Sequence, residues 1–332
     1  MGKLITIVIN CYNRKEYLIE AVNSALNQST SRDLYDVMVI KNFSDGSINE
    51  YLSKNGVKNI ETENETTGQW FLIAAKQVGS KFISFLDDDD IIHSDKISIL
   101  LRILKEYPHS TFIHNSSERK ELIQNKLNFN DVKIENIMDD GVSTFKKSLR
   151  EKRYFNLSSI TIDKDVILVN EEFVKETNHG TDMVLYAASK LTDGNRMHYE
   201  ECLTFYRVHD DSQGNFRTDG QENYEETKRV ILPNHVRNWG LISYYCRSMP
   251  IGKYAFTRVI SSKIWLNIVS QNMVYKISFK DMMQGIKLYR YYPLIVIFLS
   301  INLLDRFSHR LIKNIYFKFL FSRAGWRIRD NI

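Results

Sequence analysis

The stretch that organises this chain is Phe82-Ile83-Ser84-Phe85-Leu86-Asp87-Asp88-Asp89-Asp90. Its apolar half is typical of a buried strand, and a helix is predicted from residue 91 to Tyr107 with Asp90 as its cap. Adjacent carboxylates repel one another unless a cation lies among them. At the end of a parallel strand they reach the sheet edge where ligands bind, and oxygen ligands suit Mg²⁺ or Mn²⁺. The alternative interpretation is a solvated acidic turn that caps the helix through Ser94 or Asp95.

Strand and helix patterns alternate before this stretch. Buried strands are predicted for residues 4–9 and 36–40, a short strand for 57–60, and helices for 16–27, 47–55 and 68–77. The alternation predicts a parallel sheet with helices on both faces and right-handed crossovers. The strands end on polar residues, so the segments 10–14 and 41–46 should meet the Asp run at one edge of the sheet.

Five motifs occur in a fixed order between residues 4 and 215: ITIVINCYNRKEYLIEAVNSALNQ, VIKNFSDGS, KFISFLDDDDIIHSDKI, NHGTDMVLYAASKL and LTFYRVHDDS. Together they resemble the family 2 glycosyltransferases, which have the GT-A fold. The resemblance implies a nucleotide-binding, Rossmann-like mixed α/β sheet flanked by helices. It also implies an inverting, metal-dependent glycosyltransferase that moves a sugar from a nucleoside-diphosphate sugar to a hydroxyl of a glycan or lipid-linked acceptor.

The resemblance also assigns residues to roles. It makes Asp89 the direct ligand of Mn²⁺ or Mg²⁺, with His209 as a second metal ligand or a contact to the departing phosphate. A structural role for His209 is the alternative. The residues expected against the nucleotide sugar are Asn10, Tyr12, Arg14, Asn42, Gly68, Asp87, Asp88 and Arg207. Arg207 could equally pair with a buried carboxylate, and Trp70 is expected in the core or as an acceptor platform.

Asp182 is the expected catalytic base. It follows Gly180-Thr181 and precedes an apolar helical pattern, so the simplest interpretation is a helix N-terminal residue favoured by the helix dipole. The resemblance favours the base instead. A partly desolvated carboxylate at this position would have a pKa shifted toward the useful range. Glu200 and Glu201 are the next candidates.

Two positions depart from the family pattern. Lys41-Asn42 stands where many members carry Asp-Asp or Asp-Asn, and Phe71-Leu72 replaces a usual Arg-Asn pair. These departures favour a second hypothesis, a nucleotide-sugar-binding subunit that has lost catalysis and serves assembly or regulation. Nucleotidyl transfer is a third hypothesis, weakened by the lack of a Gly-rich, Lys-bearing phosphate loop after the first strand.

The composition allows two domains. The chain has 332 residues, 43% of them hydrophobic, and three distant cysteines without a CxxC pattern, which argues against a disulfide framework or zinc site. We expect a glycosyltransferase domain over residues 1–215 and a helical extension over 216–332. Helical spacing of apolar residues predicts helices over 222–236, 252–271 and 279–289.

The C-terminal tail predicts a membrane surface as a partner rather than nucleic acid. Residues 276–332 hold eleven Lys or Arg and three Asp, whereas the whole chain has a net charge of +5. The apolar run 291–304 is shorter than the ~20 residues of a spanning helix. Basic and apolar residues alternate along 306–329, which indicates either an interfacial helix or a helix packed on the catalytic domain. Since no signal peptide is expected before residue 4, we expect a cytoplasmic protein with peripheral membrane contact.

Overall fold

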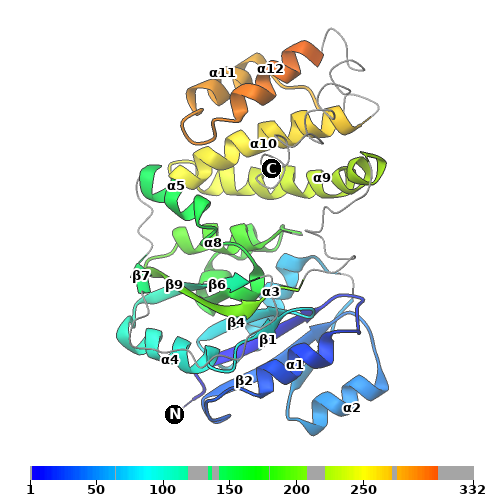
Figure 1. Cartoon of the computed structure of the whole chain (residues 1–332), viewed down its shortest axis with the longest axis vertical. Coiled ribbons are helices and arrows are strands. Elements are labelled where there is room, and N and C mark those ends of the chain that lie inside the picture. Colours follow the sequence, from blue (N-terminus) through cyan, green and yellow to red (C-terminus); the bar gives the residue numbers. More distant parts are fainter. Residues whose placement is uncertain are drawn as a thin grey trace. The chain divides into compact units, whose positions relative to one another are not determined.

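A computed structural model describes residues 2–63, 65–118, 134–136, 142–178, 180–207, 221–270 and 275–305. The chain divides into two compact units, Met1–His209 and Asp210–Ile332 (Figure 1). The expected domain boundary after residue 215 and the basic tail over 306–332 lie outside the described residues. The boundary of the glycosyltransferase domain therefore stays a prediction.

The first half of the N-terminal unit is the predicted alternation of parallel strands and helices. Strand β1 pairs in parallel with β2 on one side and with β4 on the other, and β3 extends the sheet beyond β2. The elements are β1 (Ile5–Cys11), α1 (Leu18–Leu26), β2 (Tyr35–Lys41), α2 (Gly46–Lys54), β3 (Lys58–Glu61), α3 (Thr67–Gln77) and β4 (Phe82–Asp87).

The second half makes the sheet mixed. Its strand order is β3-β2-β1-β4-β8-β6-β9-β5, with β7 beside β9. Strand β8 runs antiparallel to both β4 and β6, while β6 and β9 are parallel. The strands are β5 (Ile91–Ile92), β6 (Ser110–Glu118), β7 (Ile134–Asn136), β8 (Ile160–Asp163) and β9 (Asn195–Phe205). The GT-A-like mixed sheet is confirmed, whereas an all-parallel sheet holds only for β1 to β4.

Helices cover this half of the sheet as well. They are α4 (Lys96–Glu106), α5 (Val142–Arg150), α6 (Lys164–Val169), α7 (Glu171–Val174) and α8 (Asp182–Lys190). The prediction that α4 begins at residue 91 is wrong, because Ile91 and Ile92 pair with the end of β9 before the helix starts. Partners far away in the sequence thus override the local helical pattern.

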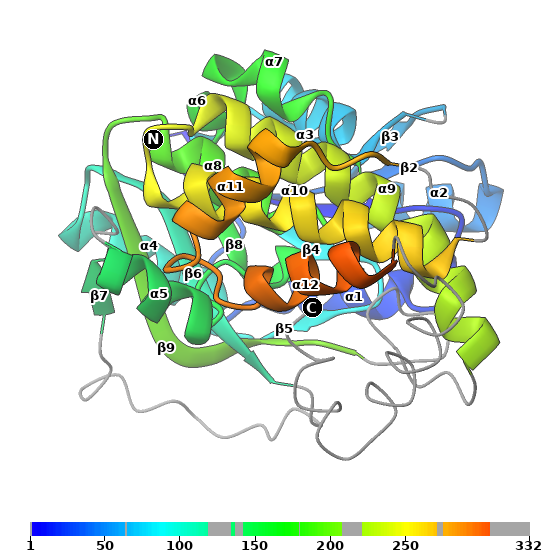
Figure 2. The same ribbon diagram turned by 90° about the horizontal axis from the view of Figure 1, so that it is seen from above.

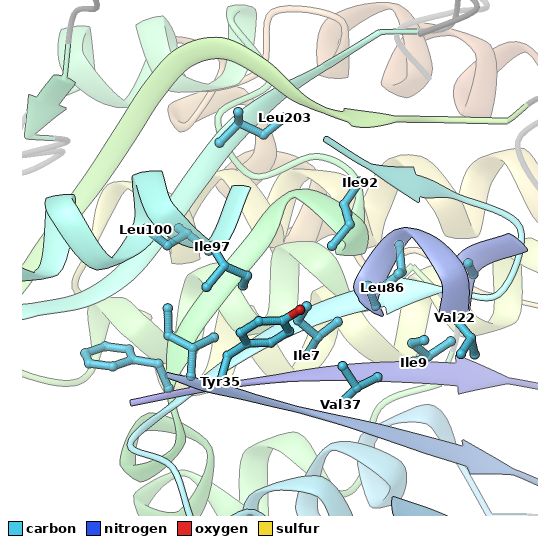
Figure 3. Packing of buried hydrophobic residues seen from close by; sticks show 14 of the residues in the cluster. Ile7, Ile9, Val22, Tyr35, Val37, Leu86, Ile92, Ile97, Leu100 and Leu203 are labelled. Atoms are coloured by element: carbon cyan, nitrogen blue, oxygen red, sulfur yellow. The ribbon is translucent and has the colours of Figure 1, made fainter. Parts of the chain in front are cut away.

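The alternating pleat of β1 sends side chains to two covered faces. Ile7 and Ile9 join one core with Val22 of α1 and with Ile97 and Leu100 of α4 (Figure 3). The other face is covered by α3, whose Phe71 ring lies 4.7 Å from that of Phe85 on β4. Because both faces are buried, β1, β2 and β4 are apolar almost throughout, and polar residues are left to the strand ends.

The C-terminal unit is helical, as expected. Helices α9 and α10 lie side by side, and α11 and α12 pack against α10 (Figures 1 and 2). Their bounds are α9 (Gln221–Tyr245), α10 (Pro250–Val269), α11 (Phe279–Lys287) and α12 (Ile295–Asp305). No helix among the described residues combines the length and the apolar character needed to cross a bilayer.

Candidate active site

Three carboxylates gather at the carboxyl end of β4. One oxygen each from Asp87, Asp89 and Asp90 lies within 4.8 Å of the others. Burial, followed by the charges of its Asp neighbours, raises the pKa of Asp87 well above its usual range. A divalent cation would relieve both costs, and carboxylate oxygens are the ligands that Mg²⁺ and Mn²⁺ prefer. The residues present therefore fit a divalent metal.

Arg14, from the loop after β1, ties down the outer part of the cluster. Its guanidinium forms ion pairs with Asp88 and with Asp89, the latter at 2.7 Å. Burial raises the pKa of Asp88, and the hydrogen bond from Arg14 counteracts part of that shift. Arg14 thus contacts the predicted metal-binding segment directly and supplies positive charge beside Asp89.

Asp90 forms hydrogen bonds to distant parts of the fold and does not cap α4. The prediction that Asp90 caps this helix is therefore wrong. One carboxylate oxygen accepts a hydrogen bond from the Ser158 hydroxyl at 2.5 Å, and the other accepts from the backbone N–H of Arg207 at 3.0 Å. Burial and the charge of Asp89 raise the pKa of Asp90 to about 7. The cap position of α4 belongs to Asp95, whose side chain makes no capping hydrogen bond.

Residues 156–159 form a turn that sequence reasoning missed. Ser158 accepts a hydrogen bond from the backbone N–H of Asp87 at 2.9 Å while it donates to Asp90. Asn156 has a φ of 70°, and its side chain accepts from the N–H of Ser158 at 3.0 Å. Asn tolerates left-handed backbone better than most residues. In the sequence, the only local indication of this turn is Asn156 followed closely by Ser158 and Ser159.

Lys96 contacts the same turn, and sequence reasoning did not identify it either. Its side chain is fully buried, and its ammonium donates to the Ser158 carbonyl at 2.5 Å. The Thr204 hydroxyl on β9 donates to the same carbonyl at 2.9 Å. Burial lowers the pKa of Lys96 to about 7, despite the opposing charge of Asp90. A buried polar network therefore fixes the position of the Asp90 carboxylate.

Asp182 is the first residue of α8, as the sequence predicts. Its carboxylate accepts hydrogen bonds from the N–H groups of Met183 at 2.8 Å and Asn156 at 3.1 Å. Burial raises the pKa of Asp182 above its usual range, although these two bonds favour the charged form. Since Asn156 also holds Ser158, one turn contacts both Asp182 and the carboxylate cluster.

The end of β1 offers polar groups for a ligand. Asn10 lies beside Asp87 in the register of β1 and β4. In the part of the chain that the structure describes, neither atom of its buried side-chain amide has a hydrogen-bond partner. Such a group costs free energy unless a ligand or water satisfies it. Tyr12 is 54% exposed, and its ring lies 5.9 Å from that of Trp70, which is buried.

The end of β2 is satisfied within the protein. Asn42 accepts a hydrogen bond from the N–H of Asn13 at 2.8 Å and donates to its side chain at 2.9 Å. Lys41 is fully buried, and its ammonium pairs with Glu61 of β3 at 2.7 Å. Lys41 and Asn42, which depart from the family pattern, therefore both contact neighbouring loops and strands.

Gly68 and the Phe71-Leu72 pair have structural surroundings. A Cβ at Gly68 would lie 1.9 Å from the Val174 carbonyl oxygen, so α3 can approach this segment only with glycine there. Phe71 and Leu72 are buried in the core. The nucleotide contact expected at Gly68 stays a prediction.

Arg207 lies beside the carboxylate cluster. Its Nε donates to the Asp89 carbonyl at 3.0 Å, its guanidinium pairs with Glu20, and the same group lies 4.5 Å from the centre of the Tyr17 ring. Arg207 therefore contacts the predicted metal-binding segment. Its contact to the diphosphate stays a prediction. His209, the other expected metal ligand, lies outside the described residues.

Solved structures with the same architecture are glycosyltransferases. Staphylococcus aureus TarS 1–349 in complex with UDP-GlcNAc has a TM-score of 0.50 and 12% identity, covering 86% of this chain and 89% of that one. The mannosyltransferase PcManGT from Pyrobaculum calidifontis, in complex with GDP-Man and Mn²⁺, has a TM-score of 0.51 and 11% identity, covering 92% and 87%. These likenesses show the GT-A fold.

Sequence comparison gives the family. Residues 6–152 match the model of glycosyl transferase family 2, and this part of the chain is a glycosyltransferase domain of that family. An uncharacterized glycosyltransferase of Rickettsia conorii is 28% identical over 128 residues, 36% of this chain and 21% of that protein. The poly(ribitol-phosphate) beta-N-acetylglucosaminyltransferase TarS of Staphylococcus aureus is 24% identical over 108 residues, 31% and 19% of the two chains. The matched segments thus span about a fifth of these relatives.

Proposed function

We propose that the chain is an inverting, metal-dependent glycosyltransferase that moves a sugar from a nucleoside-diphosphate sugar to a hydroxyl of a glycan or lipid-linked acceptor. The observation that carries the proposal is the group formed by Asp87, Asp89 and Asp90 at the end of β4. Its position beside the unsatisfied amide of Asn10 suits a nucleoside diphosphate at the edge of the sheet.

The chain's own residues account for the chemistry as follows. A Mn²⁺ or Mg²⁺ ion held by Asp89 and its neighbours would supply positive charge against the leaving diphosphate. Asp182 takes the proton from the acceptor hydroxyl, whose oxygen forms the new bond to the anomeric carbon while the bond to the diphosphate breaks. The raised pKa of Asp182 makes it a better proton acceptor than an exposed carboxylate. One displacement at that carbon inverts its configuration.

Asp182→Asn tests the base. Nucleotide binding should stay close to normal, while transfer falls by roughly 10²–10⁴-fold, the usual effect of losing a general base. Donors should first be identified by screening nucleotide sugars with Mn²⁺ or Mg²⁺ for thermal shift and slow hydrolysis. Asp165→Asn, which removes an exposed carboxylate in the first turn of α6, is the matched control. Full transfer by the Asp182 variant would move the base elsewhere.

A second candidate function is a nucleotide-sugar-binding subunit without catalysis. Two observations favour it. Asn42 is hydrogen-bonded to Asn13 and Lys41 is ion-paired with Glu61. In addition, Arg14 already pairs with Asp89. The same screen separates the two functions. Donor binding with no hydrolysis and no transfer to any glycan would support the binding subunit.

Membrane contact belongs to the same proposal. Apolar side chains of the C-terminal unit are exposed, among them Phe279 of α11 at 76% and Ile297 of α12 at 51%. Together with the basic residues that follow in the sequence, they suit an anionic membrane surface. Sedimentation with anionic liposomes should lose efficiency in a form that ends at Asp305, and in high salt. Equal pelleting of both forms would contradict this role for residues 306–332.

A further inference from the structure

A cavity of about 360 Å³ lies in the N-terminal unit, and none of the predicted nucleotide-contact residues is among its lining residues. It is lined by His114, Ser116, Ser117, Arg150, Glu151, Lys152, Phe155 and Tyr206. Its volume falls in the range of small-ligand sites. Phe155 precedes Asn156, whose N–H binds Asp182, and Tyr206 precedes Arg207, which contacts Asp89. The cavity walls are therefore continuous with the proposed catalytic groups.

His114, which lines the cavity, is held by hydrogen bonds to residues far away in the sequence. His114 is buried, and its Nε2 lies 2.8 Å from the Phe155 carbonyl oxygen, which can only accept. Nε2 therefore carries the proton, and Nδ1 accepts from Nδ1 of His198 at 3.1 Å. Burial and the neighbouring His198 lower the pKa of His114 to about 3, so the His114 imidazole is neutral at physiological pH. The His114 side chain therefore holds the Phe155 backbone without adding charge to the cavity lining.

Two irregularities of the backbone shape the walls. The pairing of β6 with β9 shifts register on both sides of Ser116, so the regular pleat is interrupted at the serines that line the cavity. Lys152 has a φ of 52°, a conformation that non-glycine residues rarely adopt. Bulges and left-handed residues concentrate next to functional sites. Both occur here among the residues that line one cavity.

The cavity wall combines aromatic rings with excess positive charge. The rings of Phe155 and Tyr206 lie 6.0 Å apart at an angle of 68°. The Lys152 ammonium lies 5.4 Å from the centre of the Phe155 ring. Glu151 is paired with Arg153 at 2.5 Å and with Arg150 at 3.5 Å. Among the lining residues, Arg150 and Lys152 therefore outnumber Glu151, the one carboxylate.

We propose that this cavity binds the acceptor, and that the acceptor is a glycan bearing an anionic group, a phosphate or a carboxylate, next to the hydroxyl that is glycosylated. This inference rests on the proposed function. Aromatic rings offer faces to the C–H groups of a sugar, the serine hydroxyls offer hydrogen bonds, and Arg150 and Lys152 offer charge-assisted bonds to the anion.

Calorimetry on the full chain, saturated with UDP or GDP and Mn²⁺, tests the proposal with glycerol 3-phosphate, glucuronic acid, glucose and inorganic phosphate as probes. At least one of the two acidic organic probes should bind about tenfold more tightly than glucose. Arg150→Gln and Lys152→Asn should each weaken that binding about tenfold. Asn is chosen at position 152 because it tolerates the left-handed backbone. Lys146→Gln, an exposed residue of the same helix α5, is the matched control.

Three results would overturn the acceptor site: equal binding of glucose and the acidic probes, equal loss in the Lys146 control, or inorganic phosphate binding as tightly as glycerol 3-phosphate. The last would mean that the aromatic walls contribute nothing. Nucleotide affinity is measured in the same samples and should not differ among the variants. If the unmodified chain does not bind UDP or GDP, that result contradicts the proposed function, whatever the outcome at the cavity.

Discussion

The carboxyl ends of β2 and β4 lie in one sheet with only β1 between them, and they handle charge in opposite ways. At β2, hydrogen bonds from Lys41 and Lys15 lower the pKa values of Glu61 and Asp45. At β4, burial and like charges raise the pKa values of Asp87 and Asp90. The carboxylates near the end of β2 are paired with lysines. At the end of β4, by contrast, the buried carboxylates cost electrostatic free energy that a bound cation would recover.

This difference separates structural from functional polar residues better than residue type does. Both strand ends are rich in charge, and a count of acidic groups would not distinguish them. The distinguishing property is whether each charge already has an opposite charge within the fold. By that criterion, Lys41 makes a structural contact to Glu61, while Asp87 and Asp90, which form no ion pair among the described residues, stand out as candidates for ligand binding beside the Arg14-paired Asp89.

The largest expected effect comes from removing a carboxylate at β4. Asp89→Ala should abolish metal-dependent nucleotide binding and leave the fold intact, because Asp89 lies beyond the end of β4 and outside the hydrophobic core. Calorimetry with a nucleoside diphosphate and Mn²⁺ measures it, with circular dichroism as the check on folding. Undiminished affinity would remove the metal site from this stretch.

A smaller effect is expected from the turn that positions Asp90. Ser158→Ala removes one of the hydrogen bonds to the Asp90 carboxylate and the acceptor of the Asp87 N–H, so metal-dependent nucleotide binding should weaken about tenfold. The free energy of unfolding should fall by about 1–3 kcal/mol.

Ser159→Ala is the matched control for that variant. The Ser159 hydroxyl is buried in the same turn and has no hydrogen-bond partner among the described residues. Its removal should leave stability within about 0.5 kcal/mol and binding unchanged. If both serine variants behave alike, the contact to Asp90 does not position the carboxylate.

The dependence of metal binding on pH gives a third test. The raised pKa of Asp90, about 7, means that the folded protein holds this proton more tightly than the unfolded chain does. Metal-free stability from this group therefore falls as pH rises from about 4 to 7. Mn²⁺ competes with the proton, so it should raise Tm by roughly 5 °C at pH 8 and by far less at pH 5.

The Tm difference with and without Mn²⁺ is the quantity to compare, because other groups titrate in the same range. His114 and His235 have pKa values lowered to about 3 by burial, which makes the fold less stable as pH falls below about 6.5. Their contributions cancel in the difference. A Mn²⁺ effect that is independent of pH would mean that Asp90 does not share the ion's site.

The smallest effect is expected at the end of β2. Asn42→Ala removes two hydrogen bonds to Asn13 and should lower the free energy of unfolding by about 1 kcal/mol. Asn42→Asp keeps the acceptor for the Asn13 N–H and should lose less. Chemical denaturation measures both. A loss of nucleotide affinity much larger than tenfold in the alanine variant would show that Asn42 reads the base, and that the two strand ends are both functional.

Local patterns determined much of this protein. Apolar runs of strand length, helical spacing between them and polar residues at the strand ends were enough to predict β1 to β4, their helices and the place of the Asp run. Asp182 was likewise placed correctly at the start of a helix. These features depend on neighbours within a few residues, so the sequence carries them directly.

Only the tertiary structure decided the rest. The antiparallel insertion of β8 between β4 and β6, the bonds from Ser158 to Asp90 and Asp87, the pairing of Lys41 with Glu61 and the stacking of His114 on His198 all join residues far apart in the chain. A serine or a lysine has the same local pattern whether it faces water or a buried carboxylate. Burial and the nearby charges set its pKa and its role, and both arise only when distant segments meet.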